Sequence, residues 1–329
     1  MIFAFIDFYA ILYREATFSE KSTGLKTEAG TGNVSASNVV KRCFRERNGG
    51  MFMLKRLLFI FNFLTLPRSI IKNWTLLLQM VERNLAARYK GAMLGWVWCF
   101  FQPLLMLCVY TFVFSVVFKL RWGAAAGGES RGAFAVIMFC GIALYSIFSE
   151  CISNNCGVIL SNTNYVQKVI FPLEILPLSQ VLTSFILGVA WFILLFAGVV
   201  LIFGKLSWTM IFILPVLAVL LLFTLGISYI VASLGVYVRD LSYVVQILLQ
   251  ILFFMTPIFY PISAVPPQYR VFLQANPLTI LIEEARKVFI YGSLPDWKYL
   301  GIAFLVSVLV LQLGFSFFYK TQKGFADVL

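Results

Sequence analysis

ILPLSQVLTSFILGVAWFILLFAGVVLIFG, residues 175–204, decides the fold of this chain because it contains no charged side chain. A helix of about 20 apolar residues crosses the roughly 30 Å hydrocarbon core of a bilayer. One Lys or Arg at the centre of such a helix would cost about 2.5–3.5 kcal/mol on insertion scales. The stretch therefore predicts a transmembrane helix.

Five further stretches share this apolar character, so the sequence predicts six transmembrane helices. The other five are 92–118, 133–149 (extended by weakly polar residues to about 159), 206–238, 241–269 and 299–319. Residues 271–282 are also apolar, but they are too few to span, and Asn276-Pro277 interrupts them. We expect a re-entrant periplasmic segment of short helices there, before the last span. The predicted fold class is an all-α integral membrane protein.

The composition excludes several classes of function. The chain is 61% hydrophobic and 12% charged, whereas soluble domains are about 25% charged. It has no histidine, which excludes a histidine-based catalytic triad and most zinc sites. Its six cysteines show no metal-ligand spacing. We therefore expect no metal site and no soluble fold.

The basic residues gather on one flank of the apolar body. Fourteen of the 26 Lys and Arg residues precede residue 91, and the net charge is +12. Cytoplasmic loops carry an excess of positive charge, and the segment before the first span usually dominates orientation. This pattern favours a membrane surface over a nucleic acid as the basic flank's partner. It also predicts a multi-pass protein with both termini in the cytoplasm.

The chain divides into three predicted regions. Residues 1–50 are expected to be a disordered extension, or to precede the true start of translation. Residues 51–91 form a basic cytoplasmic segment, and residues 92–325 form the six-helix membrane domain. Within the second region, 69–90 has helical periodicity and predicts an amphipathic interfacial helix. Its apolar stripe consists of Ile70, Trp74, Leu77, Val81 and Leu85.

No catalytic or nucleotide-binding motif accompanies these helices. A P-loop needs G-x-x-x-x-G-K-[ST], and the nearest approach, Gly204-Lys205-Leu206, has no hydroxyl residue. Glu150 and Glu174 lie at the ends of predicted spans rather than at their centres. Carriers driven by ions generally need an ionisable group near the midplane. Energy for active transport must then come from another subunit, or transport is passive.

Six motifs occur in a fixed order among the predicted spans. They are Arg88-Tyr89-Lys90-Gly91 with Leu94-Gly95-Trp96 and Gln102-Pro103; Lys168-Val169-Ile170-Phe171-Pro172-Leu173-Glu174-Ile175-Leu176-Pro177-Leu178-Ser179; Arg239-Asp240-Leu241; Thr256-Pro257-Ile258-Phe259-Tyr260-Pro261; Asn276-Pro277-Leu278-Thr279 with Glu283 and Arg286; and Pro295-Asp296-Trp297. In this order the chain resembles the ABC-2 type permeases that export bacterial polysaccharides. The resemblance covers about residues 67–325.

This resemblance implies a homodimeric permease of the bacterial inner membrane that pairs with two separate ATP-binding cassette subunits. Those subunits would bind ATP and magnesium, so no cofactor is expected on this chain. The substrate would be O-antigen, capsule or wall teichoic acid carried on undecaprenyl diphosphate. Leu173 departs from the family pattern, in which a basic residue is common at that position.

Two groups of residues are candidates for the cytoplasmic side of the transport path. A lipid-diphosphate entrance is predicted at Arg83, Arg88 and Lys90, although the same charges could simply anchor the chain by the positive-inside rule. By resemblance, the loop after the second span couples to the ATPase, although it could be a plain solvated connection. Its candidate residues are Asn162, Asn164, Tyr165, Gln167 and Lys168.

A third group consists of candidates for a glycan channel and its periplasmic gate. Sugar rings stack on aromatic faces, and proline breaks can shape a gate. The residues are Tyr110, Tyr145, Tyr260, Pro257, Pro261 and Asn276. Interfacial aromatic belts and ordinary helix kinks are the alternative interpretations.

Three rival functions stay open at this point. The first is an exporter of drugs or small lipids within the same superfamily. The second is a membrane-embedded glycosyltransferase or polymerase, which would need charged catalytic residues in long loops. The third is a secondary transporter, which the missing midplane charge disfavours.

Overall fold

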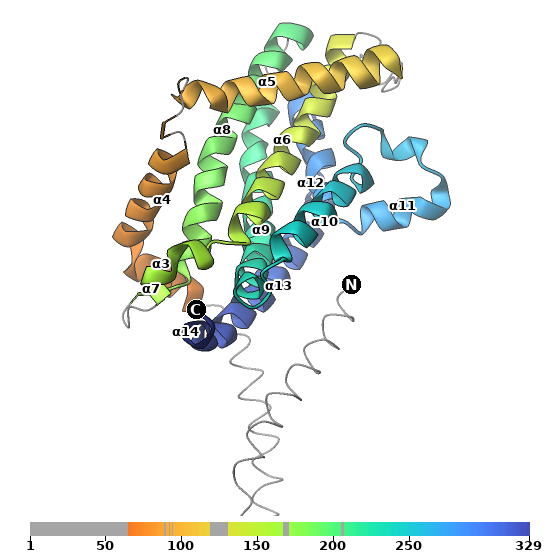
Figure 1. The fold of residues 1–329 in the computed structure, drawn as a ribbon. Coiled ribbons are helices and arrows are strands. Elements are labelled where there is room, and N and C mark those ends of the chain that lie inside the picture. The colour runs from red at the N-terminus through yellow and green to blue at the C-terminus, as the bar shows by residue number, and fades with distance from the viewer. Residues whose placement is uncertain are drawn as a thin grey trace, which may run out of the picture. The chain divides into compact units, whose positions relative to one another are not determined.

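The computed structural model describes residues 65–88, 90–91, 93, 95–118, 131–166, 171–204 and 207–329. These residues are almost entirely helical, and no strand occurs among them (Figure 1). The predicted all-α fold class is confirmed. The extension predicted at residues 1–50 lies outside the described residues.

Among the described residues, five helical segments are long and apolar enough to cross a membrane. They are Gly95–Val117, Gly132–Asn155, Ile175–Phe203, Trp208–Tyr237 and Trp297–Val328. Their main helices are α5 (Trp98–Thr111, continued by the π-helix Phe112–Val117), α6 (Arg131–Asn155), α8 (Ile175–Phe203), α9 (Ile213–Tyr237) and α13 (Trp297–Thr321). These five correspond to five of the six predicted spans, and the count of six stays a prediction.

The remaining predicted span, 241–269, is wrong in length, because the helix in the structure ends well before residue 269. Its helix α10 covers only Leu241–Met255, which is 15 residues or about 22 Å at 1.5 Å per residue. Thr256 is extended (φ −92°, ψ 138°), and Pro257 follows it. A proline offers no N–H and disfavours helical geometry in the residue before it. The chain therefore leaves the helix at Thr256 and does not continue to residue 269.

Short helices connect α10 to α13. They are the 3₁₀ turn Ile262–Ala264, α11 (Pro267–Gln274), α12 (Pro277–Arg286) and the π-helix Lys287–Tyr291. α11 and α12 match the expected pair of short helices divided at Asn276-Pro277. Pro277 stands at the first turn of α12, where its missing N–H costs no hydrogen bond. Whether this pair re-enters a bilayer stays a prediction.

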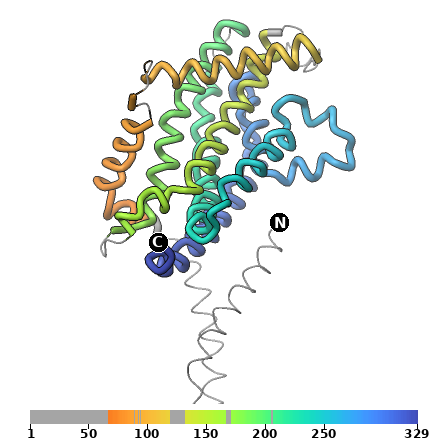
Figure 2. Tube along the Cα trace, viewed as in Figure 1, coloured from red at the N-terminus to blue at the C-terminus, as the bar shows by residue number. Residues whose placement is uncertain are grey.

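Helices α6, α8, α9 and α13 pack into the central bundle (Figure 2). α6 is buried along most of its length, and α9 makes its most extensive contact with α13. That contact depends on two glycines, because a Cβ at Gly314 would overlap the carbonyl oxygen of Gly226. Small residues let membrane helices approach closely without a hydrophobic driving force.

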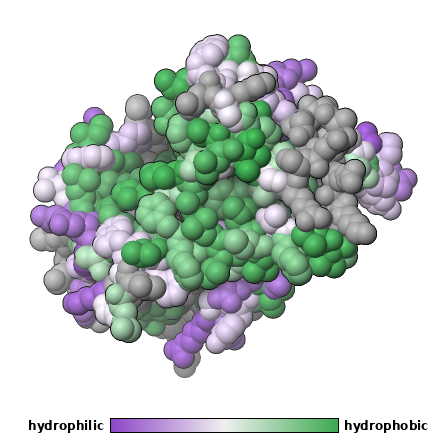
Figure 3. Space-filling view, turned by 90° about the horizontal axis from the view of Figure 1, so that it is seen from above, coloured by the Kyte–Doolittle hydropathy of each residue, from purple (hydrophilic) through white to green (hydrophobic). Residues whose placement is uncertain are grey.

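α5 lies across α6 and α8 rather than alongside them (Figure 1). Pro103 is its only buried residue. Seen from this side, apolar side chains cover the centre of the surface and polar ones lie towards its rim (Figure 3). An exposed apolar surface of this kind is normally covered by lipid or by another subunit.

The predicted amphipathic helix is present but is divided in two. α3 covers Thr65–Lys72 and α4 covers Trp74–Arg88. α4 packs on α8 through Leu77, Met80 and Val81, which are buried. Trp74, expected in the apolar stripe, is instead exposed.

On the cytoplasmic side predicted above, two further short helices follow α6 and α13. The first is α7 (Thr163–Val166), which the 3₁₀ turn Leu160–Asn162 precedes, and the second is α14 (Phe325–Val328).

Just beyond α6, burial raises the pKa of the Cys156 thiol to about 11. It stays neutral at pH 7 and behaves as a small apolar side chain, as expected for a free cysteine.

The glycine contact between α9 and α13 can be tested by adding one methyl group. Gly314→Ala is expected to destabilise the protein by about 1–3 kcal/mol, because the new Cβ meets backbone that cannot move aside. Thermal unfolding of the purified protein in detergent measures the loss. Gly301→Ala on the same helix is the matched control, since its Cβ meets nothing within 4 Å. Equal stability of the two variants would contradict the packing described here.

Candidate functional site

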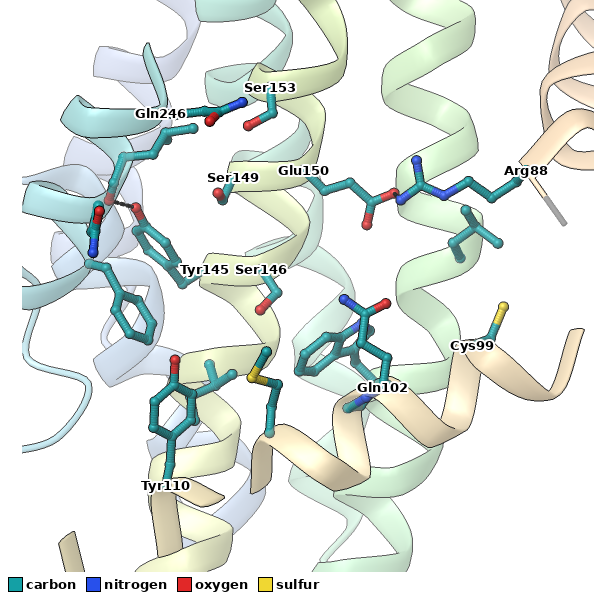
Figure 4. A pocket seen from close by; sticks show the side chains of 18 residues that line it. Arg88, Cys99, Gln102, Tyr110, Tyr145, Ser146, Ser149, Glu150, Ser153 and Gln246 are labelled. Carbon is teal, nitrogen blue, oxygen red and sulfur yellow. Dashed lines mark hydrogen bonds and ion pairs between the residues drawn. The ribbon is translucent and has the colours of Figure 1, made fainter. Parts of the chain in front are cut away.

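A pocket of about 410 Å³ lies between α5, α6, α8 and α10 (Figure 4). This volume falls within the ~300–1,000 Å³ range of ligand sites. α6 forms one wall and α10 another, while α5 crosses the pocket on a third side. α10 is short and ends at Met255. Phe253, close to this end of the helix, bounds the pocket on the α10 side.

Polar side chains converge on this pocket from three helices. Ser146, Ser149 and Ser153 recur at steps of three and four along α6, which places them on one face. Gln102 comes from α5, and α10 adds Gln246 and Gln250. Figure 4 shows Ser146 and Gln102 facing the same space.

None of these six side chains makes a hydrogen bond with another residue in the described part of the chain. The three serines are half-buried and the three glutamines are exposed, so their polar atoms are accessible from the pocket. The pocket therefore offers a row of unused hydroxyls and amides among helices that are otherwise apolar. Such a row can hydrogen-bond water or a ligand rich in hydroxyl groups.

Aromatic rings form the other part of the lining. Tyr110 and Tyr145, both predicted to lie on a glycan path, line this pocket together with Trp191. Phe253 packs between the two tyrosines, with ring centroids 5.9 Å from Tyr110 and 5.0 Å from Tyr145. The Tyr145 hydroxyl donates a hydrogen bond to the Leu249 carbonyl, which ties α6 to α10. The structure thus brings these two candidates together, and their role stays a prediction.

The four gate candidates lie in the chain that follows α10. The Tyr260 hydroxyl donates to the Phe254 carbonyl at 3.1 Å, which closes the turn that contains Pro257, and Pro261 follows this turn. Asn276 caps α12 by accepting from the Leu278 amide at 3.1 Å, and its own amide donates to Thr256. None of these four lines the pocket.

A fully buried arginine holds this turn in place. The Arg286 guanidinium, at the end of α12, donates to the carbonyls of Pro257 at 2.8 Å and Ile258 at 2.9 Å. It also donates to the Ile137 carbonyl on α6 and forms an ion pair with Glu283 at 2.7 Å. The planar five-donor fork of arginine suits such a set of acceptors.

A neighbouring glycine and a buried glutamate complete this support. Gly141 on α6 leaves room for the guanidinium, since a Cβ there would lie 3.1 Å from Arg286 Nη2. Glu284 pairs with Lys287 at 2.7 Å and accepts a hydrogen bond from the Asp296 amide, also at 2.7 Å. Asp296 caps α13, so this carboxylate connects α12 to the start of the last helix.

An ion pair closes one end of the pocket. Arg88, the last residue of α4, lies 2.8 Å from Glu150 on α6 (Figure 4). The Ser184 hydroxyl on α8 donates to the same Glu150 oxygen at 3.4 Å. Arg88 and Glu150 both line the pocket. Of the three entrance candidates, Arg88 is therefore the one placed at the pocket.

The other two entrance candidates differ from Arg88. Arg83 donates to Asn162 at 3.0 Å and to the Tyr165 hydroxyl at 3.1 Å, and its charge lies 5.6 Å from the centre of the Tyr165 ring. It joins α4 to the loop predicted to couple to an ATPase. Lys90 is exposed and makes no ion pair with any described residue.

Two members of the predicted coupling loop, Gln167 and Lys168, lie outside the described residues. Asn164 is exposed on α7. Tyr165 packs on Phe171, with ring centroids 4.5 Å apart. Loop and amphipathic helix thus form one connected surface at this end of the bundle.

Comparison with known proteins assigns the chain to a family. Residues 75–290, which include all of α4 but its first residue and the whole pocket, match the model of the ABC-2 type transporter. The chain belongs to the ABC-2 type transporter family. It is a multi-pass membrane protein of that family, as its motifs and apolar helices predicted.

Several relatives of this ABC-2 chain are named as permeases. It is 31% identical to the O-antigen export system permease protein RfbA of Myxococcus xanthus, over 80% of this chain and 98% of the relative. The protein of the same name from Klebsiella pneumoniae is 28% identical, over 77% of this chain and 95% of the relative. The polysialic acid transport protein KpsM of Escherichia coli is 23% identical, over 73% and 91%.

Sequence reasoning missed most of the pocket of this ABC-2 chain. Ser146, Ser149 and Ser153 carried a usable signal, because their spacing marks one polar face on an apolar helix. Gln102 was noted only as part of a family motif. The pairing of Arg88 with Glu150 could not be read from the chain, because 62 positions separate the two residues.

Removing the buried arginine tests how the turn after α10 is held. Arg286→Ala is expected to destabilise the protein by about 3–5 kcal/mol, because it leaves three carbonyls and Glu283 without their donor. Detergent-solubilised protein would unfold at a lower temperature or fail to accumulate.

Arg270→Ala is the matched control for this change. Arg270 donates to the carbonyls of Val265 and Ser263 in the same connection but is only partly buried. Its loss is expected to cost about 1 kcal/mol. If both substitutions cost the same, the Arg286 fork does not hold the turn.

Proposed function

We propose that this chain is the membrane permease subunit of an ATP-driven exporter that moves a lipid-linked polysaccharide of the O-antigen kind across the bacterial inner membrane. The named relatives support this, since the chain covers nearly their whole length. The observation that carries the proposal is the pocket of unpaired hydroxyls, amides and aromatic rings between four apolar helices.

The lining of the pocket suits a sugar chain. Hydroxyls of Ser146 and Ser149 and amides of Gln102 and Gln246 can exchange hydrogen bonds with sugar hydroxyls, because each group both donates and accepts. Tyr110, Tyr145 and Trp191 add aromatic rings to the lining, and sugar rings pack well against aromatic side chains. A pocket for apolar drugs would not need this row of polar groups, so the lining disfavours a drug or small-lipid exporter.

The end of the pocket at Arg88 supplies a cationic group for a diphosphate. Arg88 stands at the pocket and Lys90 follows two positions later. Guanidinium and ammonium groups bind phosphate oxygens through charge-assisted hydrogen bonds. In the proposed function these residues receive the undecaprenyl diphosphate carrier on the cytoplasmic side. Arg83 supports them indirectly, because it holds α4 against Asn162 and Tyr165.

The energy source in this proposal is a separate ATPase. Two ATP-binding cassette subunits would bind ATP and magnesium and would act on the segment that includes Asn162, Asn164 and Tyr165. Arg83 links this segment to α4, and α4 ends at Arg88 beside the pocket. A movement of this segment can therefore be transmitted through α4 to the pocket where the substrate is proposed to bind.

A second copy of the chain completes the proposal. The apolar side chains of α5, such as Phe101 and Leu105, and of α10, such as Ile247 and Ile251, are exposed beside the pocket. In a homodimer these surfaces would face one another across the transport path. Both termini would lie in the cytoplasm.

Loss of Arg88 tests the function directly. Arg88→Ala is expected to reduce surface polysaccharide at least tenfold in cells that lack the native gene, with polymer retained inside, because the carrier loses its charged anchor. Gel analysis of surface and intracellular polysaccharide measures both pools, and membrane fractionation checks that the variant is still inserted.

Lys72→Ala is the control for this experiment. Lys72 is exposed at the end of α3 and does not line the pocket, so its loss changes the net charge equally without affecting the proposed entrance. Undiminished export by the Arg88→Ala variant would remove the entrance role. Undiminished export in cells that lack the chain altogether would reject the function.

Arg83 offers a separate test of coupling. Arg83→Ala removes both hydrogen bonds between α4 and the predicted coupling segment. We expect ATP hydrolysis by the complex to continue while export falls several-fold, because the segment moves without carrying α4 with it. The ratio of polymer exported to ATP hydrolysed measures this. An unchanged ratio would show that coupling takes another route.

A further inference from the structure

The Arg88–Glu150 pair has an unusual place among the ion pairs in the described part of the chain. The other two, Arg286–Glu283 and Lys287–Glu284, join residues three positions apart around α12. Arg88–Glu150 instead joins α4 to α6, and both partners line the pocket. It is the ion pair there that a ligand in the pocket can reach.

Both side chains are open enough to exchange partners. The Arg88 side chain is 39% exposed and that of Glu150 is 25% exposed. A partly exposed ion pair is worth at most about 1 kcal/mol, and solvent screens part of it. Glu150 would not be left without a donor if Arg88 moved, because the Ser184 hydroxyl contacts it at 3.4 Å. The pair can therefore open at low cost.

The Glu150 carboxylate and a phosphate both bind the Arg88 guanidinium through its N–H donors. Arg88 Nη2 already donates to Glu150 Oε1 at 2.8 Å, which is the geometry that a phosphate oxygen would take. An anion that binds through Nη2 displaces Glu150, and one that binds through the other donors of Arg88 is repelled by the nearby Glu150 charge. The free energy of the Arg88–Glu150 pair is therefore lost when the anion binds, and this loss weakens the affinity of the site for the anion.

We propose that Glu150 is a displaceable counter-ion for Arg88, which competes with the diphosphate of the lipid substrate and thereby lowers its affinity. This inference rests on the function proposed above. An exporter has to release its substrate as well as bind it. Return of the Glu150 carboxylate to Arg88 supplies a local competitor for release, and it leaves the guanidinium paired while the pocket is empty.

The test measures binding of farnesyl diphosphate, a soluble short-chain lipid diphosphate, to the purified full chain with its ATPase partner in detergent. Glu150→Gln keeps the size of the side chain and its acceptor for Ser184 but removes the charge. We expect it to bind more tightly by up to about fivefold, the factor that corresponds to a pair worth about 1 kcal/mol. Farnesol, which lacks phosphate, should bind both proteins equally.

Two further variants separate local competition from a general effect of charge. Glu174→Gln changes the net charge equally but acts outside the pocket, where Glu174 accepts from Ser69 at 2.7 Å. Its affinity should stay unchanged. In an Arg88→Gln background, Glu150→Gln should bring no further gain, because Glu150 acts only through Arg88.

The proposal is overturned if Glu150→Gln binds no more tightly than the wild type, or if its gain persists without Arg88. If Glu150→Gln does not fold, Glu150→Asp replaces it, since a side chain shorter by one methylene weakens the pair and should give a smaller gain in affinity. A gain absent from Glu150→Asp would also overturn the proposal. Failure of the wild type to bind any lipid diphosphate would instead reject the proposed substrate.

Discussion

The rest of this structure depends on hydrogen-bond donors for the backbone carbonyls at the break after α10. The Arg286 guanidinium supplies these donors. Inside an apolar bundle, a backbone carbonyl without a donor is costly. The break after α10 frees the carbonyls of Pro257 and Ile258, and Arg286 pairs with both while Glu283 balances its charge. Because these groups are paired, α10 can end at Met255 and the chain can turn back through α11 and α12.

The same need for hydrogen-bond partners bears on the pocket, where polar side chains lack a partner within the described protein. Its serines and glutamines have no partners among the described residues. Groups that are left unpaired in an apolar protein are tolerated where they line a wet cavity or await a ligand. The chain therefore pairs the carbonyls at the break after α10, whereas the serines and glutamines of the pocket, where substrate is proposed to pass, have no partner in the part of the chain that the structure describes. α4 connects these regions, because Arg83 binds the predicted coupling segment and Arg88 closes the pocket.

Apolar run length predicted the long helices well because it is a local property. The run at 175–204 became α8, Ile175–Phe203, and Gly204 ends it with a positive φ of 61°. The same reasoning extended the fifth span past Thr256, because apolar side chains continue there while the hydrogen-bonding pattern changes. The polar pocket needs contacts among four helices, and the Arg88–Glu150 pair joins residues that are distant in the chain. Composition and periodicity carry no information on such contacts.

Translocation in proteoliposomes tests the central claim most directly. The purified chain and its ATPase partner are reconstituted with lipid-linked polysaccharide, and the sugar that has crossed the bilayer is measured by its protection from a glycosidase. The account predicts that polymer crosses only when both subunits, ATP and the lipid diphosphate carrier are present. Movement of polymer without the ATPase, or driven by an ion gradient alone, would contradict it.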